Sequence, residues 1–231
     1  MSYLETKLLL SPVQCAYRPR KSAVDHIFVL QELFLEYRFH KIGKRGGQNK
    51  KALYLCFMDL VKAFDKVARE LLFKKLFKIG VRGKMLRVIQ DMYSKNIANV
   101  LVDNCLTDDF EIQSGVIQGS KLGPLLFLVF INDLLTDLQK SVLGAKIGDI
   151  LISCLGFADD IVLSAETPQN LQALIDICER WAEKNQMTFN TSKCKVMVFN
   201  RPSSNLIFFL YKKELSLVKS YTYLGSRHRN F

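Results

Sequence analysis

Aspartates interrupt the most apolar stretches of the chain, and this placement restricts the fold more than any other feature. Residues 52–58 form a continuous apolar run that stops at Asp59. Two further apolar runs, residues 151–158 and 161–165, flank an Asp-Asp pair. Runs of this length are typical of strands that are buried on both faces. The sequence therefore predicts a core strand that ends at Asp59 and a hairpin that turns at the aspartate pair.

The positions of Asp59, Asp159 and Asp160 indicate a cation site. A carboxylate beside a core strand is costly to bury without a partner, and Mg²⁺ prefers hard oxygen ligands of this kind. Two such ions about 3.5–4 Å apart can bind the attacking and leaving oxygens of a phosphoryl displacement. We therefore expect the two strand ends to be neighbours in one antiparallel sheet, with their carboxylates within reach of a shared metal. From spacing alone, two alternatives stay open: Asp59 as a helix cap, and the pair as a plain hairpin turn.

Hydrophobic periodicity outlines the remaining elements. Ser22 and Asp25 resemble a capping box at the start of a helix, and Pro124 fits the first turn of another. The pattern predicts helices over residues 22–34, 67–77, 84–94, 122–138 and 167–181, a loop over 43–47, a hairpin over 99–104 and 109–113, and strands over 196–199, 206–211 and 221–224. Since helices and strands are mixed without strict alternation, an α+β fold is favoured over a doubly wound sheet.

Charge and cysteine content bear on partners and compartment. Thirty-three Lys and Arg stand against 22 Asp and Glu, a formal net charge of +11, which favours a polyanionic partner. A solvated basic surface or a membrane-facing one is the alternative. The six cysteines include no C-x-x-C pair, which favours buried free thiols in a reducing, intracellular protein, in nucleus or cytoplasm. The strongest apolar run, residues 125–131, is too short to span a bilayer, so we expect no membrane partner.

A series of motifs, in order along the chain, resembles those of reverse transcriptases of non-LTR (LINE-like) retrotransposons. The segment Phe157-Ala-Asp-Asp160 is similar to the Y/F-A-D-D box, and Asp59-Leu-Val-Lys-Ala-Phe-Asp65 resembles the first aspartate motif. The other matching segments are Gln14–Ser22 (a fingers motif), Ser114–Gly119 continued by Gly123–Phe127, Asn190–Lys193, and Tyr223–Gly225 (the primer-gripping turn). The resemblance covers nearly the whole chain and favours the non-LTR and group II intron branch over the retroviral one.

The resemblance implies a right-hand polymerase fold, with an antiparallel palm sheet backed by helices. Residues 1–51 would form part of the fingers and residues 52–231 the palm, with a segment near 80–113 returning to the fingers. The chain would end at the primer-grip turn, with the thumb absent. Thumb and endonuclease segments are expected in a full-length element protein.

The implied function is that of an RNA-directed DNA polymerase, which adds dNTPs to the 3′ end of a DNA primer on an RNA template. Two Mg²⁺ ions would serve the nucleotidyl transfer, with Mn²⁺ as a possible substitute. The alternative is a catalytically inactive, retrotransposon-derived fragment that acts only by binding nucleic acid. The intact aspartates favour the first function, and the missing thumb favours the second.

The resemblance also assigns roles at the reacting centre. Asp59 and Asp159 would ligate the metals, Asp160 would support them, and the backbone carbonyl of Leu60 would complete the shell. Lys193 would face the triphosphate and protonate the pyrophosphate leaving group. The alternative for Lys193 is a solvated lysine in a basic stretch.

The remaining assigned roles concern the nucleotide and the nucleic acid. Phe64 would lie under the sugar and exclude a 2′-hydroxyl, Gln118 would touch the nascent base pair or the nucleotide, and Gly119 would allow close backbone approach. Core packing and a plain loop glycine are the alternatives for Phe64 and Gly119. The expected template and primer contacts are Arg18, Arg20, Lys21, Tyr223, Leu224 and Gly225. A solvated basic turn is the alternative for the first three.

Overall fold

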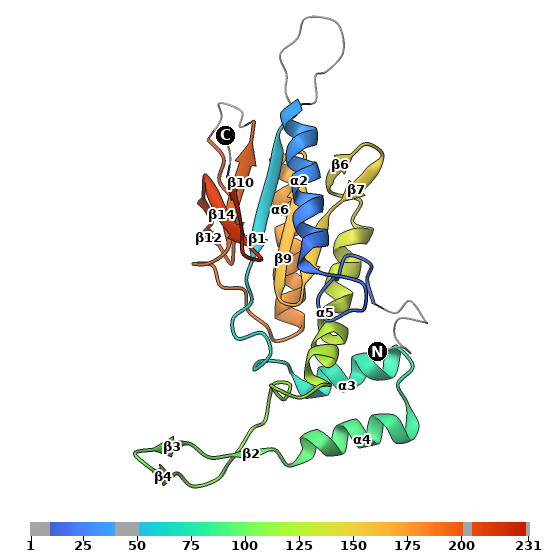
Figure 1. The fold of residues 1–231 in the computed structure, drawn as a ribbon, viewed down its shortest axis with the longest axis vertical. Coiled ribbons are helices and arrows are strands. Elements are labelled where there is room, and N and C mark those ends of the chain that lie inside the picture. The colour runs from blue at the N-terminus through green and yellow to red at the C-terminus, as the bar shows by residue number, and fades with distance from the viewer. Residues whose placement is uncertain (1–9, 40–50, 201–204, 230–231) are drawn as a thin grey trace, which may run out of the picture.

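The computed structural model describes residues 10–39, 51–200 and 205–229, and it contains helices and strands in mixed order, as predicted. Its centre is a five-stranded sheet with the order β13-β10-β1-β9-β8 (Figure 1). The strands are β1 (Leu53–Met58), β8 (Cys154–Phe157), β9 (Asp160–Ala165), β10 (Lys195–Phe199) and β13 (Ser216–Leu217). All pairs are antiparallel except β10–β13 at the edge. The predicted neighbourhood of the Asp59 strand and the Asp159 hairpin is thus confirmed.

All six residues of β1 are buried, which shows that both faces of the sheet are covered at its centre. One face packs against helices α5 (Gly123–Lys140) and α6 (Pro168–Lys184) through residues that include Cys56 and Met58. The other face carries Leu55 and Phe57 and packs against α2 (Ala23–Phe39) and β14 (Ser220–Tyr223). Figure 1 shows α2 in front of the sheet and α6 behind it.

Local sequence signals fix the helix ends. In α6, the Thr167 side chain accepts a hydrogen bond from the backbone N–H of Asn170 at 3.1 Å, an N-cap that satisfies a free donor of the first turn. In the first turn of α2, the Asp25 carboxylate accepts from the backbone N–H of Ser22 at 2.6 Å, which is one half of the predicted capping box. Pro124 lies in the first turn of α5, as predicted.

An arm of short strands leaves the body of the molecule after α3 (Arg69–Lys78) and α4 (Gly83–Ser94). It consists of two ladders, β2 (Ile97–Ala98) with β5 (Phe110–Glu111), and β3 (Leu101–Val102) with β4 (Cys105–Leu106), and it projects sideways in Figure 1. The predicted strand over residues 99–104 is wrong at its end, because the chain turns at Asp103 and Asn104. Both have positive φ, 49° and 62°, which Asp and Asn tolerate better than most residues.

Three other predictions need correction or fall outside the described residues. The apolar run 151–158 is two strands, because β7 (Ile150–Ile152) pairs with β6 (Ala145–Ile147) before β8 begins. Five cysteines are buried as predicted, but Cys105 is exposed on the arm. The loop predicted over 43–47 lies outside the described residues. The remaining short strands are β11 (Phe209–Leu210), β12 (Lys213–Glu214) and β15 (Ser226–Arg229). Within the described ranges, no helix is both long and apolar enough to cross a membrane.

Candidate active site

The three aspartates meet at one end of the sheet. Met58, the last residue of β1, lies opposite Ile161 of β9, so Asp59 follows at the edge where the β8–β9 hairpin turns. Phe157 pairs with Asp160, which leaves Ala158 and Asp159 as the two turn residues. This edge therefore brings together acidic residues that are 100 positions apart in the chain.

Side-chain alternation places Asp59 and Asp160 on the same face of the sheet. Asp59 continues the series that contains Phe57, and Asp160 stands two residues before Val162, which packs in the same cluster as Phe57. Burial is the main cause of the raised pKa of Tyr221, which lies on this same face. The negative charges of Asp160 and Asp59 raise that pKa further. The carboxylates thus share one environment.

The carboxylates of the site are electrostatically strained. Partial desolvation, with the nearby charges of Asp159 and Asp59, raises the pKa of Asp160 to about 6, even though its side chain remains partly exposed. Desolvation and the charge of Asp59 also raise the pKa of Asp159. The Lys193 ammonium acts in the opposite direction on both. The charged forms of these groups therefore lack sufficient positive charge around them.

Asp59 has a free oxygen suited to a cation. Its Oδ1 lies 3.5 Å from Lys193 Nζ, whereas its Oδ2 is buried without a hydrogen-bond partner among the residues that the structure describes. A buried carboxylate oxygen without a partner is costly, and a hard divalent cation would remove that cost. Across residues 10–39, 51–200 and 205–229, however, no three His, Cys, Asp or Glu side chains are close enough to form a ready-made metal cluster. The expected approach of the carboxylates to within reach of a shared metal therefore stays a prediction.

Lys193 and Leu60 lie beside Asp59 through backbone pairing. The N–H of Asn190 donates to the Asp59 carbonyl at 2.7 Å, and a tight turn brings Lys193 back towards the carboxylate. The Lys193 side chain is 64% exposed, so it is accessible to an anion from solvent. Leu60 is buried and bridges Phe189, and the hydrogen bonds of that bridge do not use the Leu60 carbonyl.

Phe64 has a structural partner in the core. Its half-buried ring stacks on Phe127 of α5, with ring centroids 4.4 Å apart and planes at 25°. Its backbone carbonyl accepts a hydrogen bond from the N–H of Val116, which attaches it to the loop before α5. Core packing therefore accounts for part of this ring, and the remainder is accessible.

Gln118 and Gly119 lie in the same loop. The Gln118 side-chain amide donates to Asp65 Oδ1 at 2.5 Å. Gly119 has φ of +78°, and a Cβ there would meet nothing within 4 Å, so the space on that side is open. The close backbone contact in this loop occurs instead at Gly115, where a Cβ would lie 2.7 Å from the Asp65 carbonyl oxygen.

Arg69 organises this loop and was missed in the sequence. Its guanidinium donates to the backbone carbonyls of Gly115, Tyr93, Ile112 and Ser114 at 2.5–3.2 Å. These carbonyls belong to the end of α4, the base of the arm and the start of the loop. A single arginine whose partners are backbone carbonyls carries no sequence signal for such a role.

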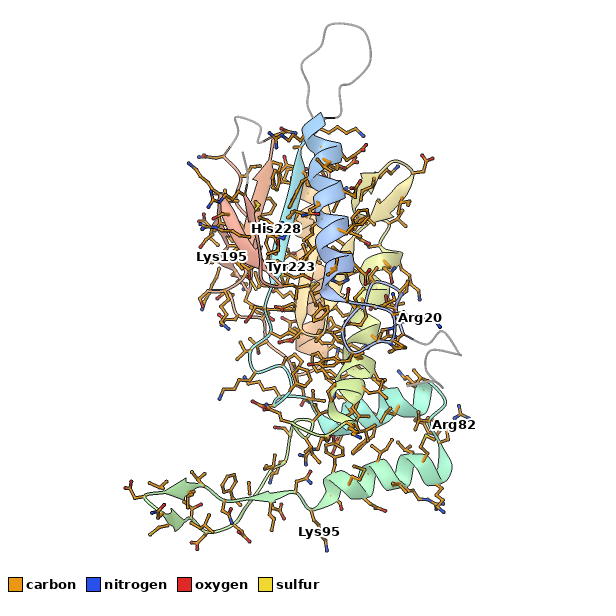
Figure 2. The ribbon with its side chains drawn as sticks, viewed as in Figure 1. Arg20, Arg82, Lys95, Lys195, Tyr223 and His228 are labelled. Carbon is orange, nitrogen blue, oxygen red and sulfur yellow. The ribbon has the colours of Figure 1, made fainter. Side chains whose placement is uncertain are left out.

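Two of the three basic residues that are predicted to bind phosphate donate hydrogen bonds within their own N-terminal segment. Arg18 donates to the backbone carbonyls of Ser11 and Gln14 at 2.7 and 3.0 Å, and Lys21 donates to that of Pro12. Both side chains therefore stabilise the backbone of the segment that carries them. Arg20 is exposed, and Figure 2 shows it at the edge of the molecule opposite Lys195.

The predicted primer-grip residues form the turn between β14 and β15. Leu224 and Gly225 have φ of 49° and 78° and occupy the two turn positions. Tyr223, labelled in Figure 2, is buried, and its hydroxyl lies 3.2 Å from His26 Nδ1. Gly225 is thus exposed at the turn, whereas the Tyr223 ring is buried.

Comparison with solved structures identifies the class of fold. Apo telomerase from Candida tropicalis, truncated from its C-terminal domain, superposes with a TM-score of 0.67 over 99% of this chain and 43% of that one. The sequences are 15% identical, so the likeness concerns the fold alone. Telomerase from Candida albicans, in a complex with an RNA fragment, gives a TM-score of 0.56. The described residues therefore share the fold of these telomerase chains.

Sequence comparison identifies the family. The family model described as reverse transcriptase (RNA-dependent DNA polymerase) matches residues 3–228, so the chain belongs to that family. The Pol polyprotein of the type-2 retrotransposable element R2DM of Drosophila melanogaster is 28% identical over 191 residues, which cover 83% of this chain. The RNA-directed DNA polymerase of the mobile element jockey of Drosophila funebris is 31% identical over 150 residues, 62% of this chain. The predicted relationship to non-LTR retrotransposon enzymes is confirmed. The chain spans 17% and 16% of the length of these two relatives.

Proposed function

We propose that this chain supplies the catalytic centre of an RNA-directed DNA polymerase from a non-LTR retrotransposon. The observation that carries the proposal is the edge where Asp59, Asp159 and Asp160 meet with Lys193 beside them. The raised pKa values of Asp159 and Asp160, caused first by desolvation and then by neighbouring carboxylates, support a site that binds positive charge. Perturbed carboxylates of this kind cluster at functional sites. The proposed substrates are dNTPs, a DNA primer and an RNA template.

The carboxylates of Asp59 and Asp159 would hold two divalent cations, Mg²⁺ or Mn²⁺, with Asp160 and the Leu60 carbonyl in support. Such ions, when bound, neutralise charge on the attacking and leaving oxygens of a phosphoryl transfer. The buried Asp59 Oδ2 and the hard-oxygen donor set fit this role. Burial and the neighbouring carboxylates raise the pKa of Asp160 to about 6, so added positive charge would favour its ionised form further.

The residues around the carboxylates would bind and orient the substrates. The exposed Lys193 ammonium would bind the triphosphate and give a proton to the pyrophosphate. Phe64 would limit the space at the sugar, and Gln118 with Gly119 would contact the nucleotide from the loop before α5. The turn Leu224–Gly225 would contact the primer. Basic residues that include Arg20 would contact template phosphates, with salt-sensitive affinity.

A second function, nucleic-acid binding without catalysis, remains a candidate because the described residues hold no ready-made cluster of three metal ligands. In that case the proposed fingers (residues 1–51) and palm (residues 52–231) would serve only to bind nucleic acid. α2 packs directly on the sheet, so the two proposed parts share a core.

The test is metal binding by the chain and by Asp159→Asn, which removes charge and keeps shape. A ligand of the folded state at 100 times its Kd adds about 2.7 kcal/mol, or roughly 5–10 °C in Tm for a chain of this size. We expect Mn²⁺ to raise the Tm of the wild type and to leave that of Asp159→Asn nearly unchanged. Asp91→Asn on α4 is the matched control and should respond like the wild type. Equal shifts in all three proteins would show that the ion binds elsewhere.

A further inference from the structure

Gln14 contacts the turn that carries Asp159, although it precedes that turn by 144 residues. Its side chain is almost fully buried, with 1% of its surface exposed. Its Oε1 accepts hydrogen bonds from the backbone N–H groups of Ala158 at 3.0 Å and Ala16 at 2.9 Å. Its Nε2 donates to the backbone carbonyl of Ala158 at 3.4 Å. One amide therefore holds both polar groups of the residue before Asp159.

The backbone around Gln14 supports this contact. Cys15 N–H donates to the Gly156 carbonyl, and Gly156 N–H donates to the Val13 carbonyl, each at 3.0 Å. These bonds form a short parallel bridge between Gln14 and Gly156 of β8. A Cβ on Gly156 would lie 2.9 Å from Leu135 Cδ1 and 3.5 Å from Gln14 Nε2. The glycine lets α5 and the Gln14 amide approach the hairpin together.

The turn needs such a contact because of the conformation of Ala158. Its φ is +54°, in the left-handed region that residues with a Cβ seldom adopt. Backbone in this region persists where the surrounding structure determines it strongly. Since the Gln14 amide bonds both the N–H and the C=O of Ala158, it fixes the peptide planes on either side. The second of these planes leads directly into Asp159.

The segment that carries Gln14 is also anchored independently. The Val13 carbonyl lies 3.0 Å from His26 Nε2, so this nitrogen carries the proton and Nδ1 accepts from the Tyr223 hydroxyl. Burial lowers the pKa of His26 to about 4, which keeps the ring neutral at pH 7. The segment therefore stays attached to α2 and β14 when the Gln14 amide is replaced.

We infer that Gln14 is a positioning residue for the metal-binding carboxylate of Asp159, acting through the backbone of Ala158. The inference rests on the proposed function, since it assumes that Asp159 binds a divalent cation. Groups that orient metal ligands typically change metal affinity by about 10–100-fold when they are removed. Gln14→Met keeps the length and volume of the side chain and removes all three hydrogen bonds.

The experiment measures Mn²⁺ affinity and hydrogen exchange in the wild type, Gln14→Met and a matched control. The control is Ser164→Ala, which removes a partly buried hydrogen bond of 2.6 Å to the Ile152 carbonyl, at the far end of the same hairpin. We expect Gln14→Met to weaken Mn²⁺ binding by about tenfold or more and to accelerate exchange of the Ala158 amide. Ser164→Ala should lose similar stability and keep the affinity and the slow Ala158 exchange.

The outcomes separate this inference from the proposed function. If Asp159→Asn abolishes Mn²⁺ binding while Gln14→Met behaves like Ser164→Ala, Gln14 is only structural and the inference is wrong. If Asp159→Asn binds Mn²⁺ like the wild type, the proposed metal site fails, whatever Gln14 does. If Gln14→Met does not fold, Gln14→Asn replaces it, because that amide is one methylene too short to reach Ala158. Unchanged affinity in folded Gln14→Asn would equally overturn the inference.

Discussion

Replacing Phe64 with alanine tests whether its ring selects the sugar or only fills the core. In the structure the ring is half-buried and stacks on Phe127 at a centroid distance of 4.4 Å. A fully buried Phe→Ala change costs about 3–5 kcal/mol, so half burial implies about 2 kcal/mol. The lost ring contact adds about 0.5–1.5 kcal/mol. We expect a loss of about 2.5–3.5 kcal/mol, or roughly 5–14 °C in Tm.

The activity arm of this test needs the chain within a protein extended to the length of its relatives. Primer extension on an RNA template is measured with dNTPs and with rNTPs, beside a melting curve. If the ring limits the space at the sugar, Phe64→Ala should use rNTPs far better while its dNTP rate falls only modestly. The sugar preference is the readout that core packing alone would not change.

Phe73→Ala is the matched control for stability. Phe73, on α3, is also half-buried against the same core cluster, and its ring meets Tyr93 edge-on with ring centroids 6.4 Å apart. It should lose comparable stability and keep the wild-type preference for dNTPs. A folded Phe64→Ala enzyme with unaltered discrimination would remove Phe64 from the nucleotide site and leave it as a core residue.

Two further predictions concern pH and salt. Because the folded-state pKa of Asp160 is raised to about 6 from 3.8, this group makes the metal-free protein less stable as pH rises through that interval, and the difference between the wild-type and Asp160→Asn unfolding curves should show it. The difference is needed because His26, whose pKa is lowered to about 4, opposes the trend between about pH 4 and 6.5, and equal curves would contradict the assignment. Affinity for a primer–template duplex should fall roughly 40-fold between 50 and 200 mM salt if about three phosphates are contacted. Salt-independent binding in a filter or anisotropy assay would count against a phosphate-dominated interface.

The sequence was sufficient for most elements of the fold because their signals are local. The apolar residues of β1 and of the hairpin are enough by themselves to indicate buried strands. The adjacency of β1 and β9 could be predicted because their aspartates suggest one shared cation site. Two- and three-residue strands such as β6 and β13 were missed, because so few residues show no periodicity. The turn at Asp103 and Asn104 was placed too late for a similar reason.

The arrangement of the candidate site was harder to predict. The contact between Gln14 and Ala158 joins residues 144 positions apart, and no spacing rule connects them. The burial of Tyr223 depends on α2, which packs against β14 from the other end of the chain. Arg69 gave no signal because its partners are backbone carbonyls, which every residue has. The three aspartates were found because charged residues seldom interrupt apolar runs of this kind.

The sideways arm has a consequence for how the polypeptide could be divided. It joins the part of the chain that contains β1 to the part that contains β8, β9 and β10, yet β1 lies between β9 and β10 in the sheet. A break in the exposed arm would leave two pieces, each with only part of one sheet. Asp59 would then be on one piece and Asp159 on the other. The two pieces would need to assemble before any carboxylate site could exist, so a split protein of this kind would link metal binding to complementation between fragments.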